Sequence, residues 1–155
     1  MSRQSDHPRV ALPPPLLFVG SFTIGLLVQW LHPISLLRFP LALCLGIALF
    51  TAGAWLGIWG ERTMKKAGTN VNPLRPATAL VTSGPFRFSR NPLYLAMVLL
   101  YLGLALAVNS LWPLVLLIPL LVVLHYGVIL REERYLESKF GDAYRDYRAA
   151  VRRWL

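Results

Sequence analysis

Residues 80–94 read Leu-Val-Thr-Ser-Gly-Pro-Phe-Arg-Phe-Ser-Arg-Asn-Pro-Leu-Tyr and lie between two long apolar blocks. The Gly84-Pro85 step is typical of a turn. Asn91 followed by Pro92 predicts a helix start, because an asparagine side chain can cap free N–H groups and proline suits the first helical position. The stretch therefore predicts a polar corner that leads into an apolar helix.

Two arginines, Arg87 and Arg90, precede this helix start. A helix N-terminus carries partial positive charge, so the corner could hold an anionic group at the boundary of water and lipid. The stretch could equally be a positively charged membrane anchor that binds no ligand. The stretch alone leaves both interpretations open.

The composition indicates one domain, covering residues 1–155, of an integral membrane protein. The chain has 155 residues, of which 55% are hydrophobic and 15% charged. The net charge of +9 comes from basic residues beside apolar spans, so we expect no nucleic-acid partner. One cysteine, Cys44, excludes an internal disulfide, and three scattered histidines predict no metal site.

Four apolar spans predict an all-α fold with four transmembrane helices and cytoplasmic C-terminal helices. Their ranges are 16–31, 39–59, 93–108 and 111–130. Pro119 predicts a kink in the last of them. Polar sequence makes up the predicted loop 61–90 and the tail 131–155.

The distribution of charge predicts the orientation. With four spans, fifteen lysines and arginines fall on the side of the loop and tail, and Arg38 alone falls on the other. Positive charge marks the cytoplasmic side, so we expect both termini in the cytoplasm, with the protein in a bacterial inner membrane.

Small residues recur at a spacing of four in the second span. Gly53 and Gly57 repeat the spacing of Ala42 and Gly46, which allows another helix to approach closely. We favour packing within the chain over the alternative, a homodimer through the Gly53 and Gly57 face.

The tail predicts two helices that meet at Gly141, a residue suited to ending a helix, with Asp142 capping the second. The second helix carries an apolar stripe, which predicts that it lies in the membrane interface. The stripe is formed by Tyr144, Tyr147, Val151 and Trp154.

The short Asn109-Ser110 link requires an antiparallel hairpin, which brings the helix start near Asn91 to Glu132 and Glu133. Nearby aromatic residues complete a set suited to a zwitterion that also carries a cation, a ribose and a flat base. The aromatic residues are Phe86, Phe88 and Tyr94.

Residues 80–94, followed by Glu132-Glu-Arg-Tyr-Leu136 and Phe140-Gly-Asp-Ala-Tyr144, resemble the isoprenylcysteine carboxyl methyltransferase and phospholipid methyltransferase superfamily. The resemblance covers about half of the chain, residues 70–155. It implies a small helical membrane enzyme that binds S-adenosylmethionine at the cytoplasmic face without a Rossmann domain.

The resemblance also implies roles for individual residues. Asn91 stands where the prenylcysteine enzymes have histidine, and Val128 where they have a substrate-facing arginine. We therefore favour an amine or thiol acceptor over a prenylcysteine carboxylate. The implied cofactor-binding residues are Leu80, Val81, Phe86, Asn91, Pro92, Leu93, Tyr94, Glu132 and Glu133.

Arg90, His125 and Arg131 are the candidate catalytic residues. Arg131 could reach back one turn toward the position of Val128. His125 is either a hydrogen-bonded packing residue or a proton acceptor for the substrate. The expected partners are membrane lipid and the substrate itself, a lipophilic or small membrane-partitioning nucleophile.

Two alternatives stay open from the sequence. One is an NADPH-dependent membrane reductase of the sterol-reductase type, with Arg87 and Arg90 on the phosphates. The other is a non-enzymatic membrane scaffold.

Overall fold

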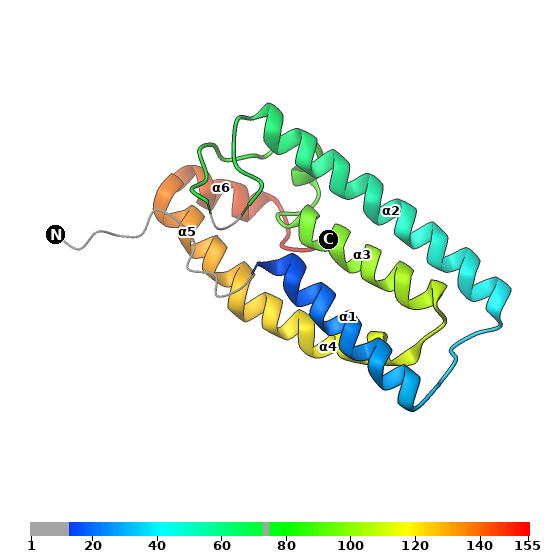
Figure 1. Cartoon of the computed structure of the whole chain (residues 1–155). Coiled ribbons are helices and arrows are strands. Elements are labelled where there is room, and N and C mark those ends of the chain that lie inside the picture. The colour runs from blue at the N-terminus through cyan, green and yellow to red at the C-terminus, as the bar shows by residue number, and fades with distance from the viewer. Residues whose placement is uncertain (1–12, 73–74) are drawn as a thin grey trace.

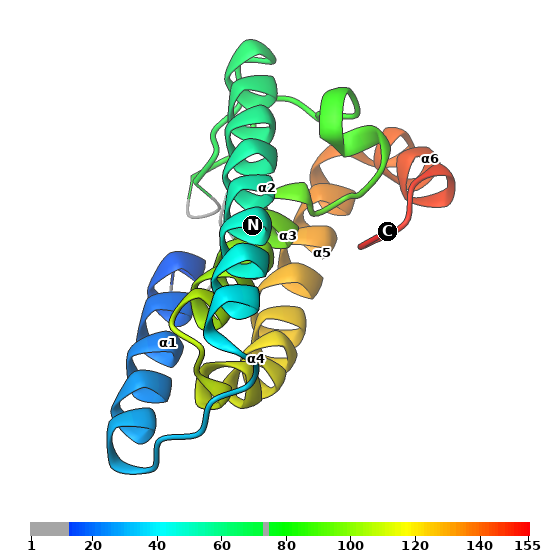
Figure 2. The ribbon, with the colours of Figure 1, turned by 90° about the vertical axis from the view of Figure 1, so that its right-hand side faces the viewer.

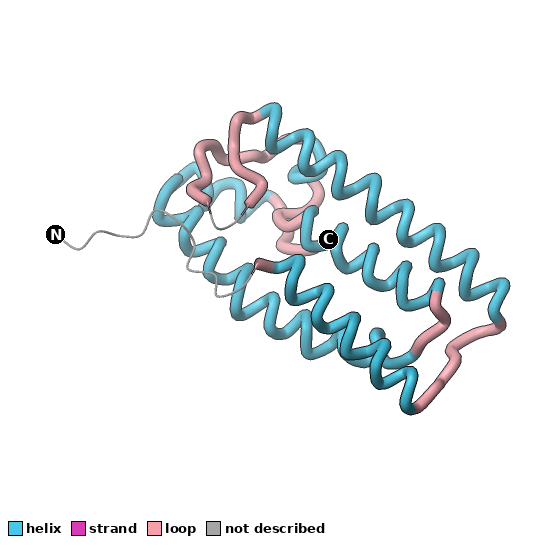
Figure 3. Tube along the Cα trace, in the orientation of Figure 1, coloured by secondary structure: helices cyan, strands magenta, loops and turns pink. Residues whose placement is uncertain are grey.

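The computed structural model describes residues 13–72 and 75–155, and this part of the chain is helical with no strand (Figures 1 and 3). The all-α prediction is confirmed. The elements in chain order are α1 (Pro14–Leu31), α2 (Phe39–Lys66), a 3-10 turn (Gly84–Arg87), α3 (Pro92–Ala107), α4 (Leu111–Leu124), a π-helical turn (His125–Ile129), α5 (Leu130–Phe140) and α6 (Asp142–Ala150).

Three helices in the described chain are long and apolar enough to cross a membrane. They are α1, α2 and the continuous helix formed by α4, the π turn and α5. The fourth predicted span, α3, is apolar but has 16 residues. Four spans therefore stay a prediction, and three are supported by length and composition.

The predicted loop 61–90 is partly wrong, because α2 continues to Lys66. Glu61 and Lys65 lie one turn apart and form an ion pair that supports this extension. Lys65 and Lys66 also suit the negative end of a helix dipole. Local side-chain pairing thus extends the helix beyond its apolar part.

Small residues bring α2 and α3 into close contact, as the sequence favoured. A Cβ atom on Gly103 would lie 2.5 Å from the Phe50 backbone nitrogen, and one on Gly53 would lie 2.8 Å from that of Leu100. The two backbones therefore meet without side chains between them. A homodimer through Gly53 and Gly57 would require α3 to move aside, and it stays a prediction.

The other helix pair is α1 with α4, which lie side by side in Figure 2. Gly25 makes their close contact, since a Cβ there would come within 2.8 Å of the Pro113 backbone. The buried core lies between these helices and α3. It consists of Phe18, Tyr94, Tyr101, Leu117, Leu120, Leu124, Val128 and Ile129.

The last long helix contains a π turn that the sequence did not predict, while the kink at Pro119 stays a prediction. α4 continues through Pro119 to Leu124, and the π turn follows at His125–Ile129. A π turn widens the helix locally and shifts the register of every residue after it. Here it sets the face on which α5 presents Glu132 and Glu133.

The tail forms two helices that meet at Gly141, whose φ of +55° favours glycine. Asp142 does not cap α6, because it is the first residue of that helix and pairs with Arg145. The predicted interfacial stripe is also wrong. Tyr144 and Tyr147 are buried within the protein, where they cover the 80–87 region.

Candidate active site

The connection between α2 and the 3-10 turn is held in shape by side chains that bond to the backbone. The buried Thr69 hydroxyl oxygen accepts from the Thr78 N–H at 3.0 Å, and Asn70 donates to the Pro76 carbonyl at 2.8 Å. The Tyr135 hydroxyl oxygen of α5 accepts from the Ala77 N–H at 3.1 Å. This connection is therefore folded against α5.

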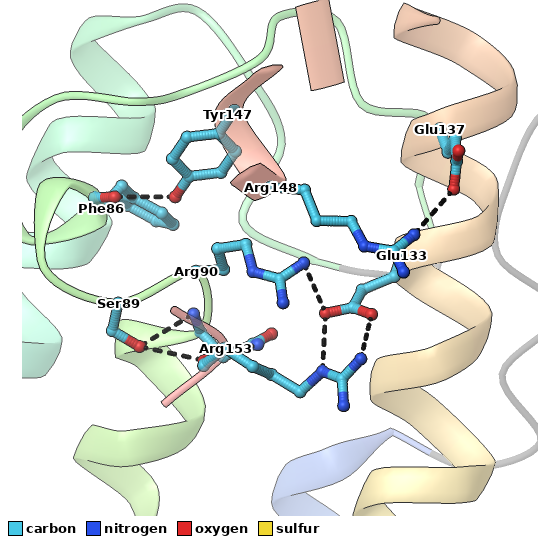
Figure 4. A network of polar contacts seen from close by, with 9 residues as sticks. Phe86, Ser89, Arg90, Glu133, Glu137, Tyr147, Arg148 and Arg153 are labelled. Atoms are coloured by element: carbon cyan, nitrogen blue, oxygen red, sulfur yellow. Dashed lines mark hydrogen bonds and ion pairs between the residues drawn. The ribbon is translucent and has the colours of Figure 1, made fainter. Parts of the chain in front are cut away.

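Gly84 forms the predicted turn and lies directly against α2. Its φ is +60°, and a Cβ there would lie 2.7 Å from the Thr63 hydroxyl oxygen. The turn after it is fixed from α6, since the Tyr147 hydroxyl donates to the Phe86 carbonyl at 2.7 Å (Figure 4). α2 and α6 thus hold the corner from two sides.

Asn91 precedes α3, but its side chain does not cap the helix. The side-chain amide donates to the Arg153 carbonyl at 3.0 Å, and the backbone N–H donates to the Ser89 hydroxyl oxygen at 3.1 Å. A carbonyl in this partly buried place needs a donor, and Asn91 supplies one. The predicted cap is wrong because this contact comes from the far end of the chain.

Glu133 is buried between two guanidinium groups (Figure 4). Arg153 engages both of its oxygens, at 2.9 Å from Nε and 2.8 Å from Nη2. The Arg90 Nη1 lies 3.1 Å from Oε1. A buried carboxylate is stable when it is paired in this way, and a bidentate arginine also fixes its orientation.

The neighbouring carboxylate, Glu132, has a different environment. It accepts a hydrogen bond from the Tyr94 hydroxyl of α3 at 2.7 Å. The two adjacent glutamates therefore face different partners, one an ion-pair network and the other a tyrosine.

Two cavities meet at this end of the bundle. The first has about 730 Å³ of empty space, including its open mouth, and lies among residues 69–72 and 75–81, the 3-10 turn, α5 and α6. The second has about 1290 Å³ on the same basis and lies among α1, α2 and α3. Seven described residues line both cavities and form the shared wall: Met64, Val71, Asn72, Phe86, Arg90, Asn91 and Glu132.

The predicted cofactor-binding residues all line one of these cavities. The first cavity is lined by Leu80, Val81 and Glu133, in addition to the shared wall, which includes Phe86, Asn91 and Glu132. The second is lined by Pro92, Leu93 and Tyr94. Residues from the corner before α3 and from α5, far apart in the sequence, are thus brought to one place.

Two of the predicted catalytic residues do not lie at the cavities. His125 and Arg131 are not among the described residues that line either cavity. The His125 ring contacts Tyr126 with centroids 4.9 Å apart, and Arg131 is exposed. Arg87 is also exposed and lies over the Phe88 ring, so Arg90 is the arginine of the corner that reaches the cavities.

Several residues of the site were missed from the sequence. Tyr144 and Tyr147 line the first cavity, although their spacing predicted a lipid-facing stripe. Burial raises the pKa of both hydroxyls above the usual tyrosine value, so both are neutral hydrogen-bond donors at neutral pH. Arg153 was counted only among the charges that set the orientation, and no local pattern connects it with Glu133.

A family model described as phospholipid methyltransferase matches residues 41–143. The chain belongs to the phospholipid methyltransferase family. The matched range includes the main walls of both cavities, and the family implies methyltransferase activity in a membrane protein. The resemblance seen in the sequence is confirmed.

One relative of this family member is an uncharacterized protein of Haemophilus influenzae. It is 50% identical over 64 residues, which make up 41% of this chain and all of that protein. No solved structure matches the chain.

Proposed function

We propose that this chain transfers a methyl group from S-adenosylmethionine to a lipophilic nucleophile at the polar end of its helical bundle. The observation that carries this proposal is the shared wall, which includes Arg90, Asn91 and Glu132. It separates a cavity with polar and aromatic walls from a largely apolar one. A water-soluble donor and a membrane-dissolved acceptor need such a junction.

The first cavity fits the methyl donor. Its wall carries a carboxylate, Glu132, for an amino group or for ribose hydroxyls, and the Phe86 ring for a flat base. The Arg90 Nε is buried and has no hydrogen-bond partner among the described residues, so a carboxylate would satisfy it. Leu80 and Val81 supply apolar wall on the same side.

S-adenosylmethionine supplies a methyl group on a positively charged sulfur, which makes the carbon electrophilic. The chain's own contribution is to align the acceptor and to exclude water. The apolar walls of α3, with Ala96, Met97 and Leu100, suit both tasks.

The second cavity fits a lipophilic acceptor that reacts through an amine or a thiol. Two carboxylates line it, Glu132 and Glu61, of which Glu61 is paired with Lys65. Its arginine, Arg90, is already paired with Glu133. Val128 is buried in the core and offers no cationic partner at the position where the prenylcysteine enzymes have arginine. An acceptor carboxylate would therefore lie beside Glu132, and the described lining offers it no cationic side chain that is not already paired.

The geometry gives no support to a proton-accepting role for His125, which lies outside both cavities. An amine acceptor would arrive beside Glu132 instead. Arg131 is likewise outside the cavities, so a role for it stays without geometric support.

The reaction is tested by supplying radiolabelled methyl donor to the detergent-solubilised protein with three acceptors in parallel. These are a phospholipid amine, a small hydrophobic thiol and a prenylcysteine. We expect label in the amine or the thiol. Transfer confined to the prenylcysteine would overturn the acceptor class, and transfer to none, with no binding of S-adenosylhomocysteine, would overturn the proposed reaction.

The proposed orientation places the cavities on the cytoplasmic side, as the charge distribution predicts. The link between α1 and α2, which holds Ser35, and helix α5, which holds Ser138, lie at opposite ends of the bundle (Figure 1). In a Cys44→Ser background, a membrane-impermeant thiol reagent added outside intact cells should label Ser35→Cys and spare Ser138→Cys. The reverse pattern would invert the orientation.

A further inference from the structure

We propose that Arg153 is a positioning residue of this site, which acts through Glu133 and makes Glu132 the carboxylate available to a ligand. The inference rests on the proposed function, because the ligand it concerns is the methyl donor. It assigns a role to Arg153 in the segment after α6, residues 151–155, which lies beyond the range of the family match.

The backbone of this segment is fastened to the start of α3. The Arg90 N–H donates to the Arg152 carbonyl at 3.0 Å, and the Arg153 carbonyl accepts from Asn91 at 3.0 Å and from the Ser89 hydroxyl at 3.3 Å. Trp154 packs against the apolar core. These contacts together fix the point from which the Arg153 side chain extends.

From that point, the Arg153 guanidinium reaches Glu133 on α5. The side chain of Glu133 is 9% exposed, whereas that of Arg153 is 30% exposed. The arginine thus spans from solvent to a buried carboxylate and occupies both of its oxygens. Such a bidentate pair resists rotation of the carboxylate toward another partner.

Loss of the Arg153–Glu133 pair would affect two neighbouring side chains, Arg90 and Glu132. Glu133 also attracts Arg90, so without Arg153 the Arg90 side chain would be its sole cationic partner in the described network. Arg90 would then turn more fully to Glu133 and away from a ligand. Glu132 would sit beside a carboxylate that is less well neutralised, which would alter its interaction with a ligand.

Arg153 itself does not line the cavities. It is not among the described residues that line them, whereas Arg90, Glu132 and Glu133 are. An effect of Arg153 on ligand affinity must therefore pass through the residues that it holds.

The first test compares Arg153→Gln with Arg152→Gln, a matched control that removes the same charge from the adjacent, exposed side chain. Affinity for S-adenosylhomocysteine is measured by calorimetry on the solubilised protein. We expect Arg153→Gln to weaken binding by on the order of tenfold, Arg152→Gln to leave it unchanged, and Arg153→Lys to fall between them. Equal effects of the two Gln variants would overturn the proposal.

The second test asks whether Arg153 acts through Glu133. In a Glu133→Gln background the further change Arg153→Gln should alter affinity by less than about twofold, because the pair is already broken. Losses that multiply would mean that Arg153 works by another route. Melting temperatures of all variants separate this effect from misfolding, since a purely structural role would lower melting but leave the affinity of the folded fraction unchanged.

A third measurement does not depend on the ligand. A water-soluble carbodiimide with an amine labels accessible carboxylates, and mass spectrometry locates the label. Glu133 should be protected in the wild type and in Arg152→Gln, and labelled in Arg153→Gln. Protection of Glu133 in the wild type and in both variants would overturn the positioning role. If the expected labelling were seen but the wild type bound no S-adenosylhomocysteine, only the proposed function would be overturned.

Discussion

The two ends of the helical bundle use similar bonds for different purposes. At the end formed by residues 32–38 and 108–110, the Asn109 side chain accepts from the N–H groups of Leu36 and Leu37 at 3.0 and 3.1 Å and donates to the Leu37 carbonyl at 2.9 Å. Trp112 donates to the His32 carbonyl at 2.7 Å. These bonds join one turn to the other.

At the opposite end, side chains also satisfy backbone groups, as Asn91 and Thr69 do. There, however, charged groups are added that no turn requires. Glu132, Glu133 and Arg90 are gathered beside cavities. Buried polar atoms without a hydrogen-bond partner among the described residues occur at both ends, at Arg90 Nε here and at Ser110 Oγ in the opposite turn, so the gathered charges make the difference. The candidate site therefore lies at the end of the bundle that has charged side chains beyond those that bond to the backbone of the turns.

The largest expected effect comes from a change that affects both ends. Gly103→Leu places a side chain where α2 backbone atoms would lie within 2.8 Å of the new Cβ atom, so α2 and α3 must separate. We expect destabilisation of about 3 kcal/mol or more, measured by unfolding in mixed micelles. Gly20→Leu is the control, since nothing lies within 4 Å of a Cβ there. Equal melting of the two variants would contradict the close packing.

A smaller effect, confined to the cavity end, is expected from Glu132→Ala. Loss of this carboxylate should weaken donor binding by about 1.5–3 kcal/mol, the scale of a hydrogen bond to a charged group, with little change in melting. Glu137→Ala is the control on the same helix, because Glu137 pairs with Arg148. If calorimetry gave the two variants the same affinity, Glu132 would have no special part in binding.

The smallest effect is expected at the end without cavities. Asn109→Ala removes three hydrogen bonds and a residue suited to its φ of +50°, so stability should fall by about 1–2 kcal/mol while donor affinity stays unchanged. Asn109→Gly keeps the backbone freedom and removes the bonds, which separates the two contributions. A change in affinity would mean that the two ends are coupled.

Local patterns predicted much of this molecule. The apolar runs predicted the helices, the small residues of α2 predicted its packing, and residues 80–94 with Glu132 predicted where the cavity would form. Each of these depends on residues near one another in the sequence or on one short hairpin.

What the sequence did not predict depends on contacts between distant segments. Arg153 reaches Glu133 only because the chain returns after α6 to the start of α3, and the same return draws Asn91 away from capping. The apolar stripe of α6 predicted a helix in the membrane interface, but Tyr144 and Tyr147 pack against protein, since periodicity does not distinguish lipid from protein. His125 had suitable chemistry, but its position on the helix leaves it outside the cavities.

The central claim is that the cavity end walled by Glu132 and Tyr94 binds the methyl donor. Calorimetry with S-adenosylhomocysteine and with NADPH, on the wild type and on the double variant Glu132→Ala, Tyr94→Ala, tests it most directly. We expect the wild type to bind S-adenosylhomocysteine and not NADPH, and the double variant to lose this binding. Binding of NADPH, or S-adenosylhomocysteine binding unchanged in a folded double variant, would contradict it.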